Sequence, residues 1–109
     1  MSAKLSDVLE LAGDLLQQSG YCKGPLATNI EGSAVSIHSP RAINFCLWGA
    51  VCKAERVLEY DTRDGYRFLL GAMGCERDPI GFSESPETTS LQASFVLWKA
   101  AELARKEGR

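Results

Sequence analysis

The fold depends on one apolar stretch in the middle of the chain, Phe45-Cys46-Leu47-Trp48-Gly49-Ala50-Val51. Ser39 and Pro40 precede it, and a serine N-cap with proline at the first helical position is a strong start signal for a helix. Together with apolar spacing that continues to Leu58, this predicts a helix over residues 39–58. Its first half is apolar nearly all round, which indicates packing on both faces, and its glycine would let a neighbouring backbone come close. We therefore expect this to be the central helix of the fold.

The segments on either side predict the remaining elements. Apolar residues recur at helical spacing over residues 3–18 and again in a final segment from about 86 to 106. A shorter helix with two internal glycines is expected over residues 66–73. Two short strands around a turn predict a β-hairpin at about residues 26–37. The expected fold class is α+β and mainly helical: about four helices around the central helix and a small hairpin, in one domain over residues 1–109.

The final helix carries apolar residues on two opposite sides. Its larger apolar residues form the expected main stripe: Leu91, Phe95, Trp98 and Ala101. A second apolar seam follows the other side: Ala93, Val96, Ala100 and Leu103. Either the protein's own hairpin covers this seam or a second copy of the chain does, and the sequence leaves both open.

Composition and charge exclude several classes of partner. The chain has 109 residues, a formal net charge of −2 and 45% hydrophobic residues, so it offers no basic surface for nucleic acid or an anionic membrane. Its longest apolar run, Phe45 to Cys52, is far shorter than the roughly 20 residues of a bilayer-spanning helix. Asp7, Glu10 and Asp14 interrupt the apolar residues that a secretory signal would need. We therefore expect a soluble, cytoplasmic protein.

The cysteines and the single histidine are the candidates for catalysis. Cys46 and Cys52 share the expected central helix on different sides, so they cannot form a disulfide with each other. Cys46 or Cys22 could act with His38 in a small cysteine-dependent hydrolase or transferase. Cys46, however, lies in the expected core stripe and more than one turn inside the helix, where the helix dipole has faded. This favours buried free thiols over catalysis.

Metal and cofactor sites are not expected. A structural zinc site needs four ligands, usually in closely spaced cysteine or histidine pairs, and the chain has neither a C-x-x-C motif nor a second histidine. Its glycines form neither a phosphate-binding loop nor a dinucleotide fingerprint. We therefore predict that the protein has no metal and no cofactor.

Three short motifs resemble one known family. They are Gly20-Tyr21-Cys22-Lys23-Gly24, the turn at Glu31-Gly32, and the segment from Ser39 to Val51. Together they resemble the domain-of-unknown-function 6197 family of bacterial and phage proteins. The family's Trp-Asn-Asp-x-Pro-x-x-Thr loop corresponds to Phe82-Ser83-Glu84-Ser85-Pro86-Glu87-Thr88-Thr89, with Phe-Ser-Glu in place of Trp-Asn-Asp. The resemblance implies a bacterial or phage source and a helical fold with a small β element, but no activity.

The sequence therefore leaves three hypotheses about function. The first is a non-enzymatic protein-interaction or regulatory module, which presents the loop at residues 79–89 or the seam from Val96 to Leu103 to a protein partner or to a second copy. The second is the cysteine-dependent enzyme. The third is a small-ligand-binding domain with a pocket lined by Tyr21, Trp48 and Phe82. The candidate binding residues are Tyr21, Trp48, Phe82, Glu84, Val96 and Leu103.

Overall fold

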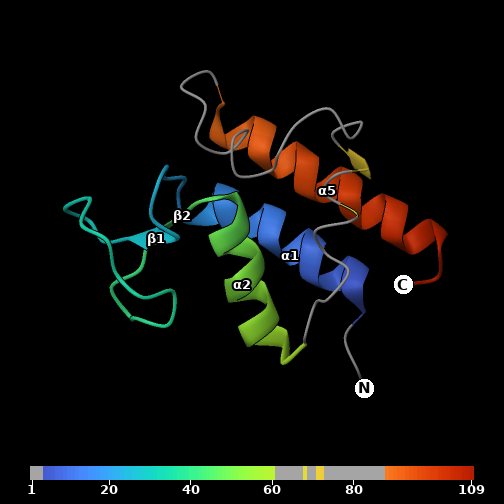
Figure 1. Ribbon diagram of the computed structural model, residues 1–109, viewed down its shortest axis with the longest axis horizontal. Helices are drawn as coiled ribbons and strands as arrows, with labels where there is room; N and C mark the ends of the chain where they lie inside the picture. The colour runs from blue at the N-terminus through green and yellow to red at the C-terminus, as the bar shows by residue number, and fades with distance from the viewer. Residues whose placement is uncertain (1–3, 61–67, 69–70, 73–87) are drawn as a thin grey trace.

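A mainly helical α+β fold is present in the computed structural model, which describes residues 4–60, 68, 71–72 and 88–109 (Figure 1). Its elements, in chain order, are α1 (Leu5–Gln18), β1 (Ala27–Thr28), β2 (Asn44–Phe45), α2 (Leu47–Leu58) and α5 (Ser90–Lys106). The described part of the chain thus contains three named helices, not about four. The remaining predicted helix, at 66–73, falls mostly outside the described residues, although Phe68, Gly71 and Ala72 are helical. None of the described helices is long and apolar enough to cross a membrane.

The central helix is α1, and the prediction that residues 39–58 form the centre is wrong. α1 packs against α5 along one side and against α2 along another, whereas α2 and α5 scarcely meet (Figure 1). Small residues, Ala12 and Gly13, lie among the leucines of its buried surface. Because they let neighbouring helices approach on two sides, α1 can serve both interfaces. The buried apolar residues of α1 are Leu5, Val8, Leu9, Ala12 and Leu16.

A set of side-chain hydrogen bonds joins α1 to α5. Ser94, which is fully buried, donates from Oγ to the Gly13 carbonyl oxygen (2.9 Å), and Ser90 Oγ donates to the Leu16 carbonyl oxygen (3.0 Å). Gln17 Nε2 in turn donates to both serine hydroxyls, at 2.8 and 3.1 Å. Buried hydroxyls need such partners, so these contacts fix how α5 is rotated and aligned against α1.

That rotation differs from the prediction for the final helix. Leu91 and Phe95, expected in the core, are 50% and 58% exposed. The buried side instead consists mainly of small residues: Ala93, Ser94, Leu97, Ala100, Ala101 and Ala104. Small side chains allow the two helix backbones to come close together. The close packing stabilises this rotation of α5 more than burial of the larger apolar residues on its opposite side would. Val96 and Leu103 are half-buried and pack against the core, so the predicted seam faces inward in part.

Helix α2 begins seven residues later than predicted, since its N-cap is Cys46 and not Ser39. Ser39 does act locally, since its Oγ accepts a hydrogen bond from the Arg41 N–H (3.1 Å), but the turn ends there. The chain then becomes extended, and Asn44 and Phe45 form β2. Pairing with a distant strand therefore overrides the local start signal.

A small antiparallel hairpin is confirmed, but with a different second strand. β1 pairs mainly with β2, in the register Ala27 with Phe45 and Thr28 with Asn44. The predicted second strand at 34–37 contributes one bridge, between Ala34 and Thr28. Tyr21 adds a parallel bridge to Phe45. The stretch before α2 is thus held between two other segments, which positions the start of the helix.

Candidate functional site

Cys46 is the N-cap of α2 and is buried. Its Sγ accepts a hydrogen bond from the Gly49 N–H (3.3 Å), and its own N–H donates to the Leu26 carbonyl oxygen (3.1 Å). The prediction that Cys46 lies more than a turn inside the helix is therefore wrong, because the helix begins later. A thiol at a helix N-terminus can be activated; this one is buried and accepts a backbone N–H of its own helix. Its position fits a structural cap.

Cys22 lies beside Cys46 on the neighbouring segment. Its N–H donates to the Phe45 carbonyl oxygen (3.1 Å), and its Sγ contacts the Pro25 carbonyl oxygen at 3.5 Å. Burial raises the pKa of the Cys22 thiol, although a hydrogen bond with Thr28 acts in the opposite direction. A raised pKa lowers the thiolate fraction that a nucleophile needs, so Cys22 has the opposite of an activated environment.

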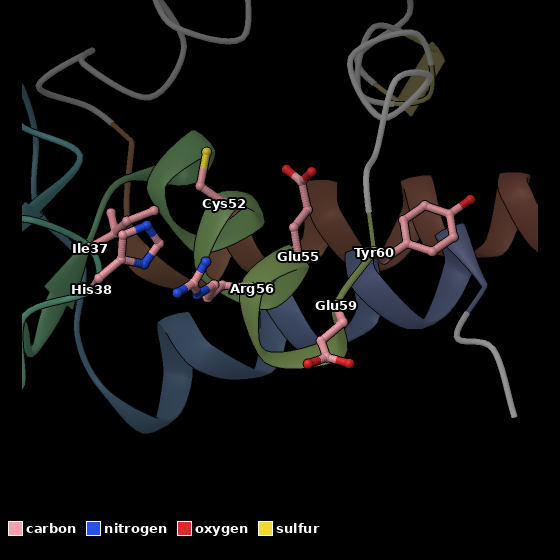
Figure 2. Close-up of a pocket in the computed structure, with 7 residues that line it drawn as sticks. All are labelled: Ile37, His38, Cys52, Glu55, Arg56, Glu59 and Tyr60. Carbon is pink, nitrogen blue, oxygen red and sulfur yellow. The ribbon is translucent and has the colours of Figure 1, made fainter.

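His38 lies in an open groove beside α2 with a volume of about 790 Å³ (Figure 2). The described residues that line it are Ile37, His38, Cys52, Glu55, Arg56, Glu59 and Tyr60. In Figure 2 the Arg56 side chain extends from α2 toward His38, and Cys52 lies one turn earlier on the same helix. The histidine is thus grouped with Cys52, and not with Cys46 or Cys22 as the sequence suggested.

The groove does not have the electrostatics of a cysteine-histidine catalytic site. Burial raises the pKa of the Cys52 thiol to about 11, with further contributions from the nearby Glu55 carboxylate and from Cys46. A thiol with this pKa is almost wholly protonated near neutral pH. Arg56 and His38 supply hydrogen-bond donors, and Glu55 and Glu59 supply carboxylates. The groove can therefore bind polar or charged groups, but Cys52 is not prepared to act as a nucleophile there.

Cys52 should accordingly react slowly with iodoacetamide. At pH 7.5 we expect alkylation of Cys52 in the folded protein to be about 100-fold slower than in the urea-unfolded chain, because only the thiolate reacts. The rate should keep rising with pH beyond the ordinary thiol pKa of about 8.5. Peptide mapping by mass spectrometry assigns the label to each cysteine. A Cys52 rate that is fast and already constant at pH 8 would contradict this prediction.

The other predicted binding residues lie partly inside and partly outside the described part of the chain. Tyr21 and Trp48 are half-buried and pack against the core. Phe82 and Glu84, with the rest of the predicted loop up to Glu87, lie outside the described residues. The proposed pocket of Tyr21, Trp48 and Phe82 therefore stays a prediction. Among the residues with a described placement, no cluster of three or more potential metal ligands occurs.

Among the described residues, α5 carries an exposed apolar and aromatic surface, and we call Leu91, Phe95 and Trp98 the outer face of α5. Phe95 packs edge-to-face on Trp98, with ring centroids 5.7 Å apart and an interplanar angle of 89°. Trp98 is half-buried and donates from Nε1 to Asp14 Oδ1 (3.0 Å). Its ring also covers Gly13, where a Cβ would come within 2.6 Å of Trp98 Cδ1. The indole is thus fixed on α1, and the exposed phenylalanine rests against it.

Sequence reasoning missed both of these surfaces for identifiable reasons. Cys52, Arg56 and Glu59 recur at the helical period, so the groove could be anticipated as one face of α2, but not the arrival of His38 beside it. The periodicity of α5 did identify Leu91, Phe95 and Trp98 as one stripe. It assigned that stripe to the core because large apolar residues are usually buried.

Comparison with known proteins gives a family but no activity. A family model described as a family of unknown function, DUF6197, matches residues 1–103. No curated protein and no solved structure matches the chain. The resemblance drawn from the short motifs is therefore confirmed, and the bacterial or phage source that it implies stays a prediction.

Proposed function

The chain belongs to DUF6197, a family of unknown function, and on that premise we propose that it is a non-enzymatic protein-interaction module. Its contact surface is the outer face of α5. The observation that carries this proposal is the exposure of two large apolar side chains, Leu91 at 50% and Phe95 at 58%, next to Trp98 on one helix. Folding alone does not need apolar residues at these positions, because the opposite side of α5 supplies the core.

The outer face is also preorganised for binding. Trp98 is held by its hydrogen bond to Asp14 and by its contact with Gly13, and Phe95 rests on its ring. Side chains that are already fixed lose little conformational entropy when a partner covers them. Aromatic residues of this kind contribute disproportionately to binding energy at protein interfaces. These properties support the docking of a partner on the outer face of α5 more than they support exposure of its apolar side chains by chance.

The environments of the cysteines support the non-enzymatic part of the proposal. Cys46 is buried and caps α2, and burial raises the pKa of both Cys22 and Cys52. Activation of a nucleophilic thiol requires the opposite change in pKa. Cys22 and Cys52 therefore do not resemble the nucleophile of a cysteine-dependent enzyme, and Cys46 is enclosed in the core.

A second candidate function is small-ligand binding in the groove beside α2. Its volume of about 790 Å³ is within the usual range of ligand sites, about 300–1,000 Å³. Arg56 and His38 at one end offer donors to an anionic group. The groove is open, and four of the seven described residues that line it are acidic or basic side chains, His38, Glu55, Arg56 and Glu59, so we rank this candidate second.

Quantitative affinity capture from a lysate of the native host tests the proposal and separates the two candidates. We expect Phe95→Glu to reduce recovery of the partner about tenfold or more, because truncating a central aromatic anchor commonly has this effect. Val57→Glu is the matched control, since Val57 is a similarly exposed apolar residue (55%) on α2. It should leave recovery unchanged.

The groove is tested in the same experiment with Arg56→Ala. If Arg56→Ala abolishes recovery while Phe95→Glu does not, the groove and not α5 is the binding site. If no protein, including the host's own copy of this chain, is recovered in a Phe95-dependent manner, the interaction proposal is wrong.

A further inference from the structure

The segment that follows α1 runs alongside β2 in the same direction. The Phe45 N–H donates to the Gly20 carbonyl oxygen (2.9 Å), and the Cys22 N–H donates to the Phe45 carbonyl oxygen (3.1 Å). These two hydrogen bonds form the parallel bridge between Tyr21 and Phe45. In a parallel pair of strands, the residues that follow a bridged pair also lie side by side. The pairing therefore places Cys22 next to Cys46.

The two cysteine side chains lie on the same face of this small sheet. Successive side chains of a strand point to opposite faces, so Cys46 shares a face with Asn44 and not with Phe45. On that face Asn44 Nδ2 donates to Thr28 Oγ1 (3.2 Å). The Cys22 thiol also forms a hydrogen bond with Thr28. The Cys22 thiol is thus on the face that carries Cys46, away from the side chain of Phe45.

The separation of the two residues suits a disulfide. Neighbouring strands lie about 4.8 Å apart, and disulfides join residues whose Cα atoms are about 4.4–6.8 Å apart. In the reduced protein each sulfur has a weak contact of its own: Cys22 Sγ donates to the Pro25 carbonyl oxygen (3.5 Å), and Cys46 Sγ accepts the Gly49 N–H (3.3 Å). Rotation of both side chains about their Cα–Cβ bonds exchanges these two contacts for an S–S bond.

Cys52 does not compete for either partner at this position. It follows Cys46 on α2 by six residues, which places its side chain about 240° further around the helix and about 9 Å further along the axis. It lines the groove with His38 instead. Among the described cysteines, which are all free thiols, Cys22 and Cys46 are therefore the pair that the backbone brings together.

We propose that Cys22 and Cys46 are a redox-sensitive pair, which closes to a disulfide and fastens the segment after α1 to the first residue of α2. The inference does not depend on the outer face of α5. The bond encloses β1 and the loop that leads to β2 (Figure 1). Because a disulfide restricts the chain on both sides of the loop that it closes, oxidation makes this part of the fold harder to open.

The oxidant is a low-molecular-weight disulfide of the glutathione type. Cys22 is half-buried whereas Cys46 is 7% exposed, so the Cys22 thiolate attacks one sulfur of the oxidant, forms a mixed disulfide and releases one thiolate. The Cys46 thiolate then attacks Cys22 Sγ, forms the Cys22–Cys46 bond and releases the second thiolate. Two cysteine thiols are oxidised, the S–S bond of the oxidant is reduced, and the two released thiolates take up the two protons.

Incubation of the folded full-length chain with oxidised glutathione tests the pair. After the remaining thiols are alkylated, chymotrypsin can cleave after Trp48 and so separates Cys46 from Cys52, and mass spectrometry of the unreduced digest identifies the linked peptides. We expect Cys22 linked to Cys46 as the main product. Cys52→Ser and Cys75→Ser should each leave this product unchanged, whereas Cys22→Ser should abolish it.

Thermal melting tests whether the bond suits the native fold. The oxidised wild-type chain should melt about 5 °C or more above the reduced chain, because the bond constrains the unfolded state. Cys22→Ser keeps the Cys46 cap and should show no shift on treatment with the oxidant. Circular dichroism before oxidation establishes that each variant is folded.

Several results would overturn the inference. One is a folded chain in which Cys22 keeps the glutathione and does not link to Cys46. Others are a main product that joins Cys52, Cys75 or two copies of the chain, and a Cys22–Cys46 link that forms only in urea. An oxidised chain that melts below the reduced one has been forced out of its native geometry, which contradicts the proposal as well.

Discussion

Replacing Gly49 by alanine should lower the free energy of unfolding by about 3 kcal/mol, the upper end of what an extra buried methyl group commonly costs. A Cβ at this position would lie 2.8 Å from the carbonyl carbon of Leu26 and closer still to its oxygen. That backbone cannot move aside easily, because the same Leu26 oxygen accepts the Cys46 N–H. The clash should outweigh the gain in helix propensity, about 1 kcal/mol, that alanine normally brings.

Gly71→Ala is the matched control for Gly49→Ala. Gly71 is also helical but exposed, and a Cβ there would make an ordinary contact with Leu103 Cδ1 at 3.6 Å. This variant should be neutral or more stable by up to about 1 kcal/mol. Urea denaturation followed by circular dichroism measures both. Equal effects of the two substitutions would show that the chain does not cross α2 closely at Gly49.

Replacing Leu97 by alanine should lower the free energy of unfolding by about 3 kcal/mol, as expected for a cavity at a fully buried leucine. Leu97 is 0% exposed and lies on the side of α5 that faces the core. The other buried residues of α5 are all small, so this helix has no larger side chain that could fill the space that the leucine leaves. Urea denaturation followed by circular dichroism measures this change in the free energy of unfolding.

Leu91→Ala on the same helix is the control for Leu97→Ala. Leu91 is half exposed, so its truncation should cost no more than about 1 kcal/mol. A large effect at Leu91 with a small one at Leu97 would mean that α5 is rotated as its larger apolar residues suggested. The comparison therefore tests the observation on which the proposed contact surface depends.

Local signals were sufficient to predict α1 and the final helix closely. The expected ranges of 3–18 and about 86–106 compare with Leu5–Gln18 and Ser90–Lys106. At the start of α5, the Thr89 hydroxyl accepts from the Gln92 N–H (3.2 Å) and the Gln92 side chain accepts from the Thr89 N–H (2.9 Å). Such capping boxes and helical periodicity act within about four residues, so a sequence displays them directly.

The candidate sites were less predictable, because they depend on which segments meet. His38 was expected just before the helix, yet it lines a groove with Cys52 and Arg56 of α2, because α2 starts late and leaves room for the loop. The core position inferred for Cys46 was right about its burial and wrong about its role. Its sulfur became a helix cap only because β2 ends immediately before it.

The apolar stretch from Phe45 to Val51 shows most clearly which features follow from the sequence and which depend on the tertiary structure. The sequence by itself determined that this stretch is buried, that it contains a helix and that Gly49 admits a neighbouring backbone, since these follow from composition and spacing. Only the tertiary structure decided that Phe45 belongs to a strand, that α1 is central and that α5 turns Leu91 and Phe95 outward. The physical reason is that strand pairing and helix rotation are settled by partners far away in the chain: Ala27 and Thr28 pair with β2, and Gly13 and Gln17 bind α5.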